Sequence, residues 1–385
     1  MRRHSRRAFS LTALCAVGCL VLYSTRCNTA APQKLTAVSG VTQNCSSEGC
    51  FRRLRDGNLN SDCRWGRTTR FEEPPPNWST DGAVFGCNGR PLVRETRGTP
   101  RSSLRSRFRT WETNAIELTS CPELFSSLTQ YPVERAVPPL IHRVWECADI
   151  PKRYEEDIMS WIDNAAGMFV FLWTSEVRKT FINKTLGPGN LELYNRLLPG
   201  AYRADLFRYV VMYHLGGVYS DVDAHLHMKL SNIGYLFNGT TLAIDIDAKR
   251  LLNGAILMSA REQAIFLCAM GEVFDHSAHR LYFDSDLDIS GPGILGECLR
   301  HILGKDDMIY DQKSAAEIRS LGIRLLKSEF SGDGRHVVNL NETRVLISLT
   351  PGGEAYDRTV RVECDPGEHY SVLFREKRVY NNTSL

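Results

Sequence analysis

Hydrophobic positions in the middle of the chain follow two alternating spacings, which predict helices and strands in turn. Met168–Trp173 is a continuous apolar run, typical of a strand buried on both faces of a parallel sheet. Helical spacing over Tyr154–Ala165 precedes it, and a strand-like run over Leu140–Trp145 follows two prolines. Because strand, helix and strand alternate, we expect a doubly wound α/β sheet that binds ligands at the carboxyl ends of its strands.

A second helix and strand follow directly. Apolar residues recur at three- and four-residue steps over Ala204–Leu215, so one helix face is buried. Gly216 and Gly217 supply a left-handed helix end and a tight reversal. Period-two alternation then predicts a strand over Val218–Asp223. This strand places three polar residues on one side: Tyr219, Asp221 and Asp223.

Later apolar patterns are shorter and predict a continuing mixture of strands and one helix. The helix is expected over Arg261–Phe274, where the spacing is amphipathic. Four strands are expected, over residues 241–244, 255–258, 323–326 and 344–348.

Two carboxylates at the end of the predicted strand suggest a cation site. Asp221 and Asp223 follow a helix that carries Asp205 and Arg208, three residues apart on one face. Mg²⁺ and Mn²⁺ prefer oxygen ligands and often take one or two carboxylates together with phosphate oxygens. An Asp-x-Asp tripeptide alone is weak evidence, and the alternative is a helix salt bridge beside a solvated strand end. Opposite charges on a buried helix, however, need a partner or a ligand.

The segment resembles the DXD-containing sugar transferases of glycosyltransferase family 32 over about Val137–Gly296. The resemblance rests on Arg203-x-Asp205-x-x-Arg208-Tyr209, followed by Gly216-Gly217-x-Tyr219-x-Asp221-x-Asp223. It implies a GT-A-like mixed sheet, a divalent metal, a nucleotide-sugar donor and retention at the anomeric carbon. Mannose from GDP-mannose is favoured by the family members most similar in sequence, while UDP-galactose, UDP-glucose and UDP-N-acetylglucosamine stay open.

The resemblance also assigns roles to individual residues. The catalytic set is Asp205, Arg208 and Asp221, in which the first two hold sugar hydroxyls. Donor contacts are assigned to a larger set: Trp145, Arg203, Asp205, Arg208, Tyr219, Asp221 and Asn253. The metal ligands are Asp221, Asp223 and a C-terminal histidine, His369.

Several of these residues have a structural alternative. Trp145 stacks on the nucleotide base by resemblance, or anchors a strand in the core. Arg203 approaches the phosphates or forms a salt bridge at the helix start, and His369 is a metal ligand or a polar residue on a late strand. His142 is expected to be a structural histidine. The turn Ser290–Leu295 lines the acceptor pocket or is a plain loop.

The N-terminus predicts a membrane anchor. Four arginines in the tail 1–7 precede an apolar run over residues 8–23, which favours a single-pass type II orientation in the Golgi or ER membrane. A cleaved signal peptide is the alternative. Residues 24–135 are rich in turn formers and predict an irregular lumenal stem that disulfides could staple, and the catalytic domain is expected over 136–385.

Cysteines and glycosylation motifs agree with a location in the lumen of the secretory pathway. Ten of the 12 cysteines follow the apolar run, and an even number is compatible with disulfides, whereas no C-x₂-C pair supports a zinc site. Seven N-glycosylation motifs are present. The net charge of +3 gives no reason to expect a nucleic-acid partner. The expected partners are a nucleotide sugar, a glycan or glycolipid acceptor, and the membrane.

Two other functions compete with a transferase. The family's closing Ser-Trp pair is missing after His369, which favours a catalytically silent sugar-nucleotide-binding Golgi subunit. His225 and His227 continue the alternation of the two aspartates, which suggests a metallohydrolase. The latter pattern lacks a separate nucleophile or base, so the transferase is the preferred interpretation.

Overall fold

The computed structural model describes twelve stretches of the chain, most of them in its C-terminal two thirds. These are residues 87–88, 90–94, 104–122, 124, 137–165, 167–237, 239–245, 252–305, 312–331, 334–339, 345–349 and 368–381. The expected tail 1–7 and anchor 8–23 lie outside them. Among the helices that are described, none has the length and apolar character needed to cross a bilayer.

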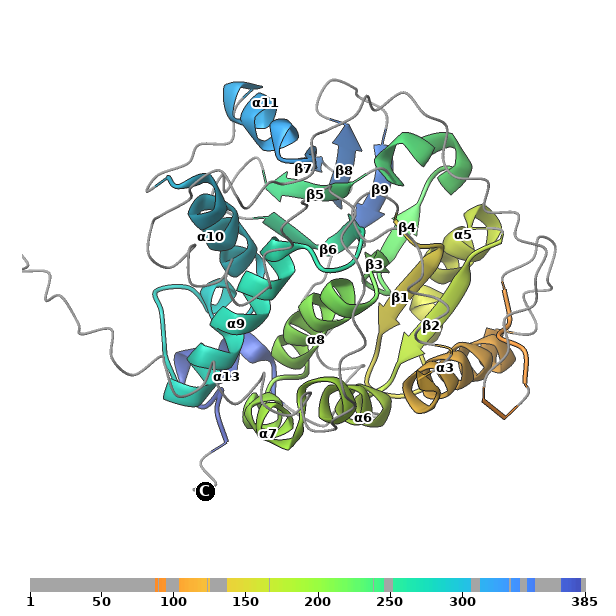
Figure 1. Ribbon diagram of the computed structural model, residues 1–385, viewed down its shortest axis with the longest axis horizontal. Helices are drawn as coiled ribbons and strands as arrows, with labels where there is room; N and C mark the ends of the chain where they lie inside the picture. Colours follow the sequence, from red (N-terminus) through yellow and green to blue (C-terminus); the bar gives the residue numbers. More distant parts are fainter. Residues whose placement is uncertain are drawn as a thin grey trace, which may run out of the picture.

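One mixed sheet organises the described residues (Figure 1). Its strands run in the order β2-β1-β3-β6-β5-β7-β8-β9-β4. Their bounds are β1 Leu140–Val144, β2 Phe169–Trp173, β3 Gly217–Ser220, β4 Ala224–Leu226, β5 Thr240–Asp245, β6 Leu252–Ser259, β7 Ile323–Ser331, β8 Gly334–Asn339 and β9 Val345–Leu349. β1 pairs in parallel with both β2 and β3, and β5 pairs in parallel with β7, while the other pairs are antiparallel. The expected mixed α/β architecture is confirmed.

Helices cover both faces of the sheet (Figure 1). Their bounds are α3 Leu104–Ser120, α5 Glu155–Asn164, α6 Ser175–Leu186, α7 Pro188–Arg196, α8 Gly200–His214, α9 Ala264–His279, α10 Pro292–Leu303, α11 Gln312–Ser320 and α13 Tyr370–Arg375. Alternate residues of β2 enter two separate hydrophobic clusters, as period-two side-chain direction requires. Phe171 and Trp173 pack in the cluster that holds α8 and α9, and Val170 and Leu172 pack in the one that holds α5.

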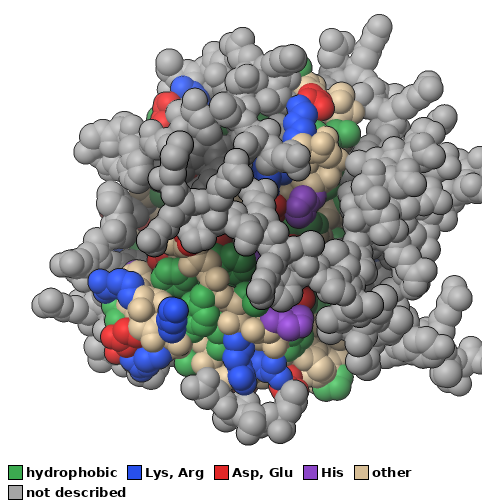
Figure 2. All heavy atoms as spheres, turned by 90° about the vertical axis from the view of Figure 1, so that its left-hand side faces the viewer, with side chains coloured by type: hydrophobic (Ala, Val, Ile, Leu, Met, Phe, Trp, Pro, Cys, Tyr) green, Lys and Arg blue, Asp and Glu red, His purple; other side chains and the backbone are tan. Residues whose placement is uncertain are grey.

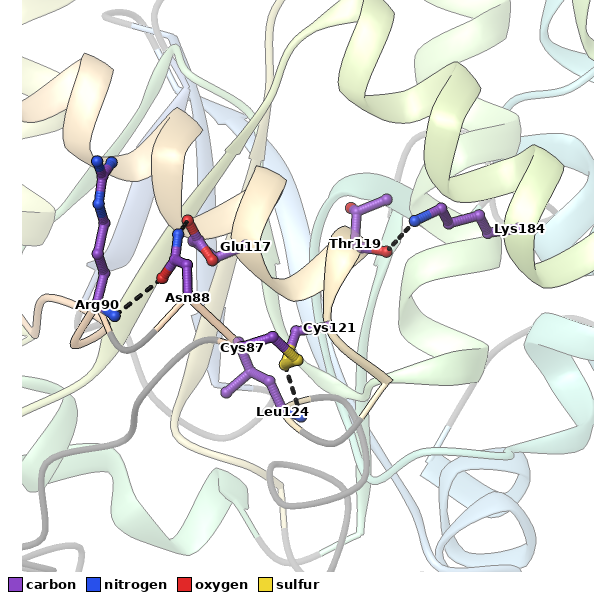
Figure 3. Close-up of a disulfide and its surroundings, with 8 residues drawn as sticks. All are labelled: Cys87, Asn88, Arg90, Glu117, Thr119, Cys121, Leu124 and Lys184. Carbon is purple, nitrogen blue, oxygen red and sulfur yellow. Dashed lines mark hydrogen bonds between the residues drawn. A yellow bond between two sulfur atoms is a disulfide. The ribbon is translucent and has the colours of Figure 1, made fainter.

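The helix α3 corrects the expected stem. Residues 104–120 were predicted as part of an irregular segment, yet Trp111 and Leu118 are buried, and Asn114 donates a hydrogen bond to the Val170 carbonyl of β2. A disulfide between Cys87 and Cys121 fastens the preceding segment to the end of this helix (Figure 3). The folded unit therefore begins upstream of the expected boundary at residue 136.

The sheet curls, so that β4, at one end of the strand order, lies close in the chain to β3, which pairs near the other end. β4 lies at the end of the strand order opposite β2, but only three residues separate it from β3 in the chain. β4 pairs with β9 and is held to α5, where Trp161 Nε1 donates to the Ala224 carbonyl at 2.7 Å. The turn between β3 and β4 is therefore fixed by elements from both ends of the sheet.

Two local predictions were wrong. β3 ends at Ser220 and not at Asp223, because the chain turns there to enter β4. His369 does not lie on a late strand; it precedes α13, where its ring accepts a hydrogen bond from the Ser371 backbone N–H. The other expected strands and the helix over 261–274 are present with shifted ends, and β8 was not expected.

Candidate active site

The two glycines after α8 place β3 in the centre of the sheet. Gly216 and Gly217 have φ values of +65° and +100°, in the left-handed region that favours glycine. A Cβ on Gly217 would lie 2.6 Å from the Leu140 carbonyl oxygen, and one on Gly216 would lie 2.7 Å from the Ser259 carbonyl oxygen. Only glycine allows β3 to enter between β1 and β6 at this spacing.

The aspartate pair lies in the turn that follows β3. The Asp221 N–H donates to the Ala255 carbonyl of β6 at 2.9 Å, and the Ala224 N–H donates to the Asp221 carbonyl at 3.2 Å. The turn thus places both aspartates at the carboxyl end of the central strand, where open α/β sheets bind ligands.

Arg208 joins the carboxylates of α8 and of the turn. Its Nη2 lies 2.7 Å from Asp205 Oδ1, and its Nη1 lies 3.7 Å from Asp221 Oδ2. The Tyr219 hydroxyl donates to Asp221 Oδ1 at 2.6 Å, and the guanidinium carbon of Arg208 lies 4.9 Å from the centre of the Tyr219 ring. Four predicted site residues therefore meet in one hydrogen-bonded cluster, which we call the DXD cluster: Asp205, Arg208, Tyr219 and Asp221.

Two further residues contact the DXD cluster: Ser290, from the turn predicted either to line the acceptor pocket or to be a plain loop, and Gly254, which was not predicted. Ser290 Oγ donates to Asp205 Oδ2 at 2.9 Å, which brings the turn before α10 against α8. A Cβ on Gly254 would lie 2.6 Å from Arg208 Nη1, so this glycine leaves the space that the guanidinium occupies. The contact between Ser290 and Asp205 joins residues 85 positions apart, a separation at which no local pattern indicates a contact.

Burial and charge oppose each other in the DXD cluster. Burial disfavours the charge on Arg208, yet Asp221, Tyr219 and Asp205 raise the pKa of its guanidinium well above the usual value. Burial raises the pKa of Asp205, against the opposing effects of Arg208 and of the hydrogen bond from Ser290. The guanidinium is therefore a fixed positive charge at the strand end.

The charged form of Asp223 is disfavoured by its surroundings. Burial and the neighbouring Asp221 carboxylate raise its pKa to about 7, while Arg143 acts in the opposite direction. Two carboxylates on one short turn repel each other, and a divalent cation would relieve that repulsion. This oxygen-only donor pair fits Mg²⁺ or Mn²⁺ better than a soft metal.

Arg143 is a further buried charge near the turn, and sequence analysis assigned it no role. It is fully buried on β1, and its Nε and Nη2 have no hydrogen-bond partner. Its Nη1 lies 3.5 Å from the Val222 carbonyl, and it interacts electrostatically with Asp157, Asp223 and Asp221. The strand pattern predicts that Arg143 is buried. It does not predict which charged side chains surround Arg143.

The remaining predicted donor residues make contacts with other side chains of the protein. Trp145 is partly buried and packs edge-on against Tyr154, with ring centres 5.6 Å apart. Arg203 Nη2 lies 3.8 Å from Glu146 Oε2, which agrees with the salt-bridge alternative. Asn253 donates to Ser328 Oγ and accepts from the Ala255 N–H, so both ends of its amide are used within the protein.

His142 and the pair His225 and His227 lie in different surroundings, while the rings of the pair are 4.8 Å apart. His142 is a structural histidine, as expected: its Nδ1 accepts from Trp173 Nε1, so its Nε2 donates to the Gly216 carbonyl at 2.8 Å, and burial lowers its pKa to about 4. His225 Nδ1 lies 3.3 Å from Asp157, and His227 Nε2 lies 2.8 Å from Ser348 Oγ. Within the described part of the chain, His369 is not gathered with Asp221 and Asp223 into a group of metal-ligating atoms.

Comparison with known proteins agrees with this geometry. Residues 151–237 match the family model described as "Glycosyltransferase sugar-binding region containing DXD motif". This part of the chain is therefore similar to DXD-type glycosyltransferase sugar-binding regions. The match includes the whole DXD cluster and the turn with Asp223, and the expected resemblance to family 32 is confirmed.

Curated relatives are similar over about a quarter of the chain. "Inositol phosphoceramide mannosyltransferase 2" of Schizosaccharomyces pombe is 31% identical over 109 residues, which are 28% of this chain and 31% of the relative. "Mannosyl phosphorylinositol ceramide synthase SUR1" of Saccharomyces cerevisiae is 31% identical over 99 residues, 26% of each chain. The chain thus spans less than a third of the length of these relatives.

One solved structure is similar at low identity. The match to the "PaToxG Glycosyltransferase" covers 57% of this chain and 89% of that structure's chain. The sequence identity is 14% and the TM-score is 0.35.

Proposed function

We propose that the chain is a metal-dependent retaining glycosyltransferase that moves a hexose from a nucleotide sugar to a glycan or glycolipid hydroxyl. The observation that carries the proposal is the DXD cluster, in which Arg208 lies between Asp205 and Asp221 at the carboxyl end of β3. The family match over residues 151–237 supports the reaction class. The Schizosaccharomyces pombe relative is named as a mannosyltransferase, which favours mannose from GDP-mannose over the UDP-sugars.

Two residues would hold the cation. Asp221 and Asp223 would bind Mn²⁺ or Mg²⁺, which when bound supplies positive charge to the diphosphate of the leaving nucleotide. His369 stays a candidate third ligand by resemblance alone.

The other residues of the cluster orient the sugar. Asp205 and Arg208 present a carboxylate and a guanidinium that hydrogen-bond sugar hydroxyls, and Ser290 fixes the Asp205 carboxylate. Tyr219 holds Asp221 in one rotamer through its hydroxyl. Trp145, Arg203 and Asn253 complete the proposed donor site. The acceptor hydroxyl would attack from the same face as the leaving phosphate. Its oxygen bonds to the anomeric carbon as the bond to the phosphate oxygen breaks, and the leaving phosphate takes the hydroxyl proton, so the anomeric configuration is retained without a protein nucleophile.

The test is donor hydrolysis by the purified protein with Mn²⁺ or Mg²⁺ across GDP-mannose and the UDP-sugars. Asp223→Asn is expected to reduce metal-dependent hydrolysis about 100-fold or more, the usual effect of removing one preorganised electrostatic group. Asp163→Asn, at an exposed position on α5, is the control. Unchanged hydrolysis by a folded Asp223→Asn protein would contradict the assignment of the metal ligand.

A catalytically silent sugar-nucleotide binder is the second candidate. It is favoured by the position of His369, whose ring Nδ1 lies 2.6 Å from Ser371 Oγ. Titration with GDP and UDP in the presence of Mn²⁺, followed by a panel of acceptors, separates the two functions. Binding without turnover on any donor would favour the silent subunit.

For the cellular address we propose the Golgi or ER membrane, with the folded domain in the lumen. The disulfides Cys87–Cys121 and Cys268–Cys298 support an oxidising compartment. Protease protection of the domain in sealed microsomes tests the orientation, and digestion without detergent would contradict it.

A further inference from the structure

The first turn of α8 carries a buried hydroxyl next to the DXD cluster. Tyr202 lies three residues before Asp205, so the two side chains are neighbours on the helix surface. Only 2% of Tyr202 is exposed, and its hydroxyl has no hydrogen-bond partner among the described residues. A buried polar group without a partner costs free energy, and a ligand that hydrogen-bonds to it would remove that cost.

Two carboxylates lie near this hydroxyl. Burial raises the pKa of Tyr202, and the charges of Asp286 and Asp205 raise it further, so the phenol keeps its proton. Asp286 belongs to the short 3₁₀ helix η5 (Asp286–Asp288), four residues before Ser290, whose hydroxyl donates to Asp205 Oδ2 at 2.9 Å. Both carboxylates are partly exposed. The place therefore combines a hydroxyl that can donate with charged oxygens that only accept.

The C-terminal helix α13 adds an aromatic side. It contacts both α8 and η5. The centre of the Tyr370 ring lies 5.8 Å from that of Tyr202 and 4.3 Å from that of His369, and Tyr370 and His369 are partly exposed. Figure 2, which views the molecule from the side on which α9 and α13 lie in Figure 1, shows hydrophobic side chains interspersed with acidic, basic and histidine ones. Three segments far apart in the sequence thus meet beside Asp205.

This combination of groups suits a ring that bears several hydroxyls. Carboxylates accept hydrogen bonds from ring hydroxyls, the phenol donates one, and aromatic rings pack against the apolar C–H groups. The charge of Asp286 would repel a phosphate, so the neutral part of an acceptor fits here. A purely structural role would not need the Tyr202 hydroxyl, because phenylalanine fills the same space without an unsatisfied group.

We propose that Tyr202, Asp286 and Tyr370 form an acceptor subsite that binds a ring with several neighbouring hydroxyls. The inference rests on the proposed transferase function and names the acceptor group that the site takes. Asp205 lies at the border with the donor, since its Oδ1 pairs with Arg208 at 2.7 Å and its Oδ2 accepts from Ser290. Rings of this kind occur at the end of a glycan and in the cyclitol headgroup of a glycolipid.

The test is binding of two probes to the full chain, methyl α-mannoside and myo-inositol, by saturation-transfer NMR with GDP and Mg²⁺ present. The parent protein is expected to bind at least one of them. Preference for the mannoside would assign the subsite to a glycan end, and preference for inositol to a cyclitol headgroup. The measurement needs no turnover. Absence of donor hydrolysis would therefore contradict the proposed transferase, whereas absence of binding by both probes would overturn the subsite.

Two substitutions locate the binding. Tyr202→Phe and Asp286→Asn are each expected to weaken probe binding about 10-fold, the effect of one lost hydrogen bond to a ligand hydroxyl. Asp286 is partly exposed, so Asp286→Asn keeps the test valid where Tyr202→Phe disturbs the packing of α8. Thermal melting checks that both variants are folded.

Asp284→Asn is the matched control, because Asp284 is exposed and lies two residues before Asp286. It is expected to bind the probes as the parent protein does. Equal weakening by Asp284→Asn and Asp286→Asn, or parent-like binding by a folded Asp286→Asn protein, would overturn the proposal.

Discussion

His142 and Arg143 are neighbours on β1 and are both fully buried, yet their polar atoms differ in how they are satisfied. His142 points to the α8 side, where both ring nitrogens have hydrogen-bond partners. Arg143 points to the α5 side, where two of its three guanidinium nitrogens have none and three aspartates lie nearby. A buried group whose hydrogen bonds are all made stabilises the fold. A buried charge without hydrogen-bond partners, beside carboxylates, indicates a place where a bound ligand would change the local electrostatics.

The largest effect is expected on the α8 side, at Gly254. Gly254→Ala would displace the Arg208 guanidinium, because its Cβ would lie 2.6 Å from Nη1. We expect donor hydrolysis to fall about 100-fold, as for loss of one electrostatic group in a site. Gly189→Ala, whose Cβ would meet nothing within 4 Å, is the control. Normal kinetics of Gly254→Ala would show that the position of Arg208 does not matter.

Next in size is His142→Phe, which leaves the Gly216 carbonyl and the Trp173 N–H without partners. Unsatisfied buried groups cost about 1–3 kcal/mol each, so we expect roughly 2–4 kcal/mol of lost unfolding free energy. Denaturant unfolding measures this loss, and activity per folded molecule should be preserved. An unfolding free energy equal to that of the parent protein would contradict a structural role for His142, and with it the contrast to Arg143.

A smaller effect is expected from Asp223→Asn without metal. The folded pKa of Asp223, about 7, lies above the ordinary value of 3.8, so the folded state binds more protons between these values. Its contribution to stability is therefore full below pH 3.8 and is lost as pH rises through 7. We expect Asp223→Asn to gain about 1 kcal/mol relative to the parent protein at pH 8 and less at pH 5, as thermal melting can show.

The smallest effect is expected at Arg143. Because Arg143 lowers the pKa of Asp223, Arg143→Met should move the pH midpoint of metal-dependent hydrolysis upward. The expected shift is less than about one pH unit, which corresponds to less than about 1.4 kcal/mol. His142→Phe should leave the midpoint in place. A downward shift, or equal shifts in both variants, would contradict an electrostatic role for Arg143.

Local patterns predicted the parts of the fold that depend on local spacing. The strands around residues 140 and 170 and the helix ending at Leu215 follow from apolar periodicity and from the two glycines. The meeting of Asp205, Arg208, Tyr219 and Asp221 was also predicted, from their spacing and from the family resemblance. Their roles in donor binding and catalysis stay predictions.

Long-range contacts were beyond the reach of the sequence. The turn at Ser290 was a candidate pocket lining, but its contact with Asp205 and the contact of Gly254 with Arg208 leave no local signal in the sequence. The pattern around Arg143 predicts only a strand, so the aspartates that surround its side chain could not be predicted from the sequence. The folding of α3 against β2 was also missed, since the turn formers of residues 24–135 suggested an irregular stem.

The pairing of β4 with β9 has a practical consequence for anyone who expresses this protein in parts. The family match ends at residue 237, but β4, inside the match, completes its hydrogen bonds with residues 345–349. A fragment cut at the homology boundary would expose β4 as a bare edge next to the aspartates, and such edges promote aggregation. Soluble, metal-responsive protein should therefore require the C-terminal strands, although they carry no recognised motif.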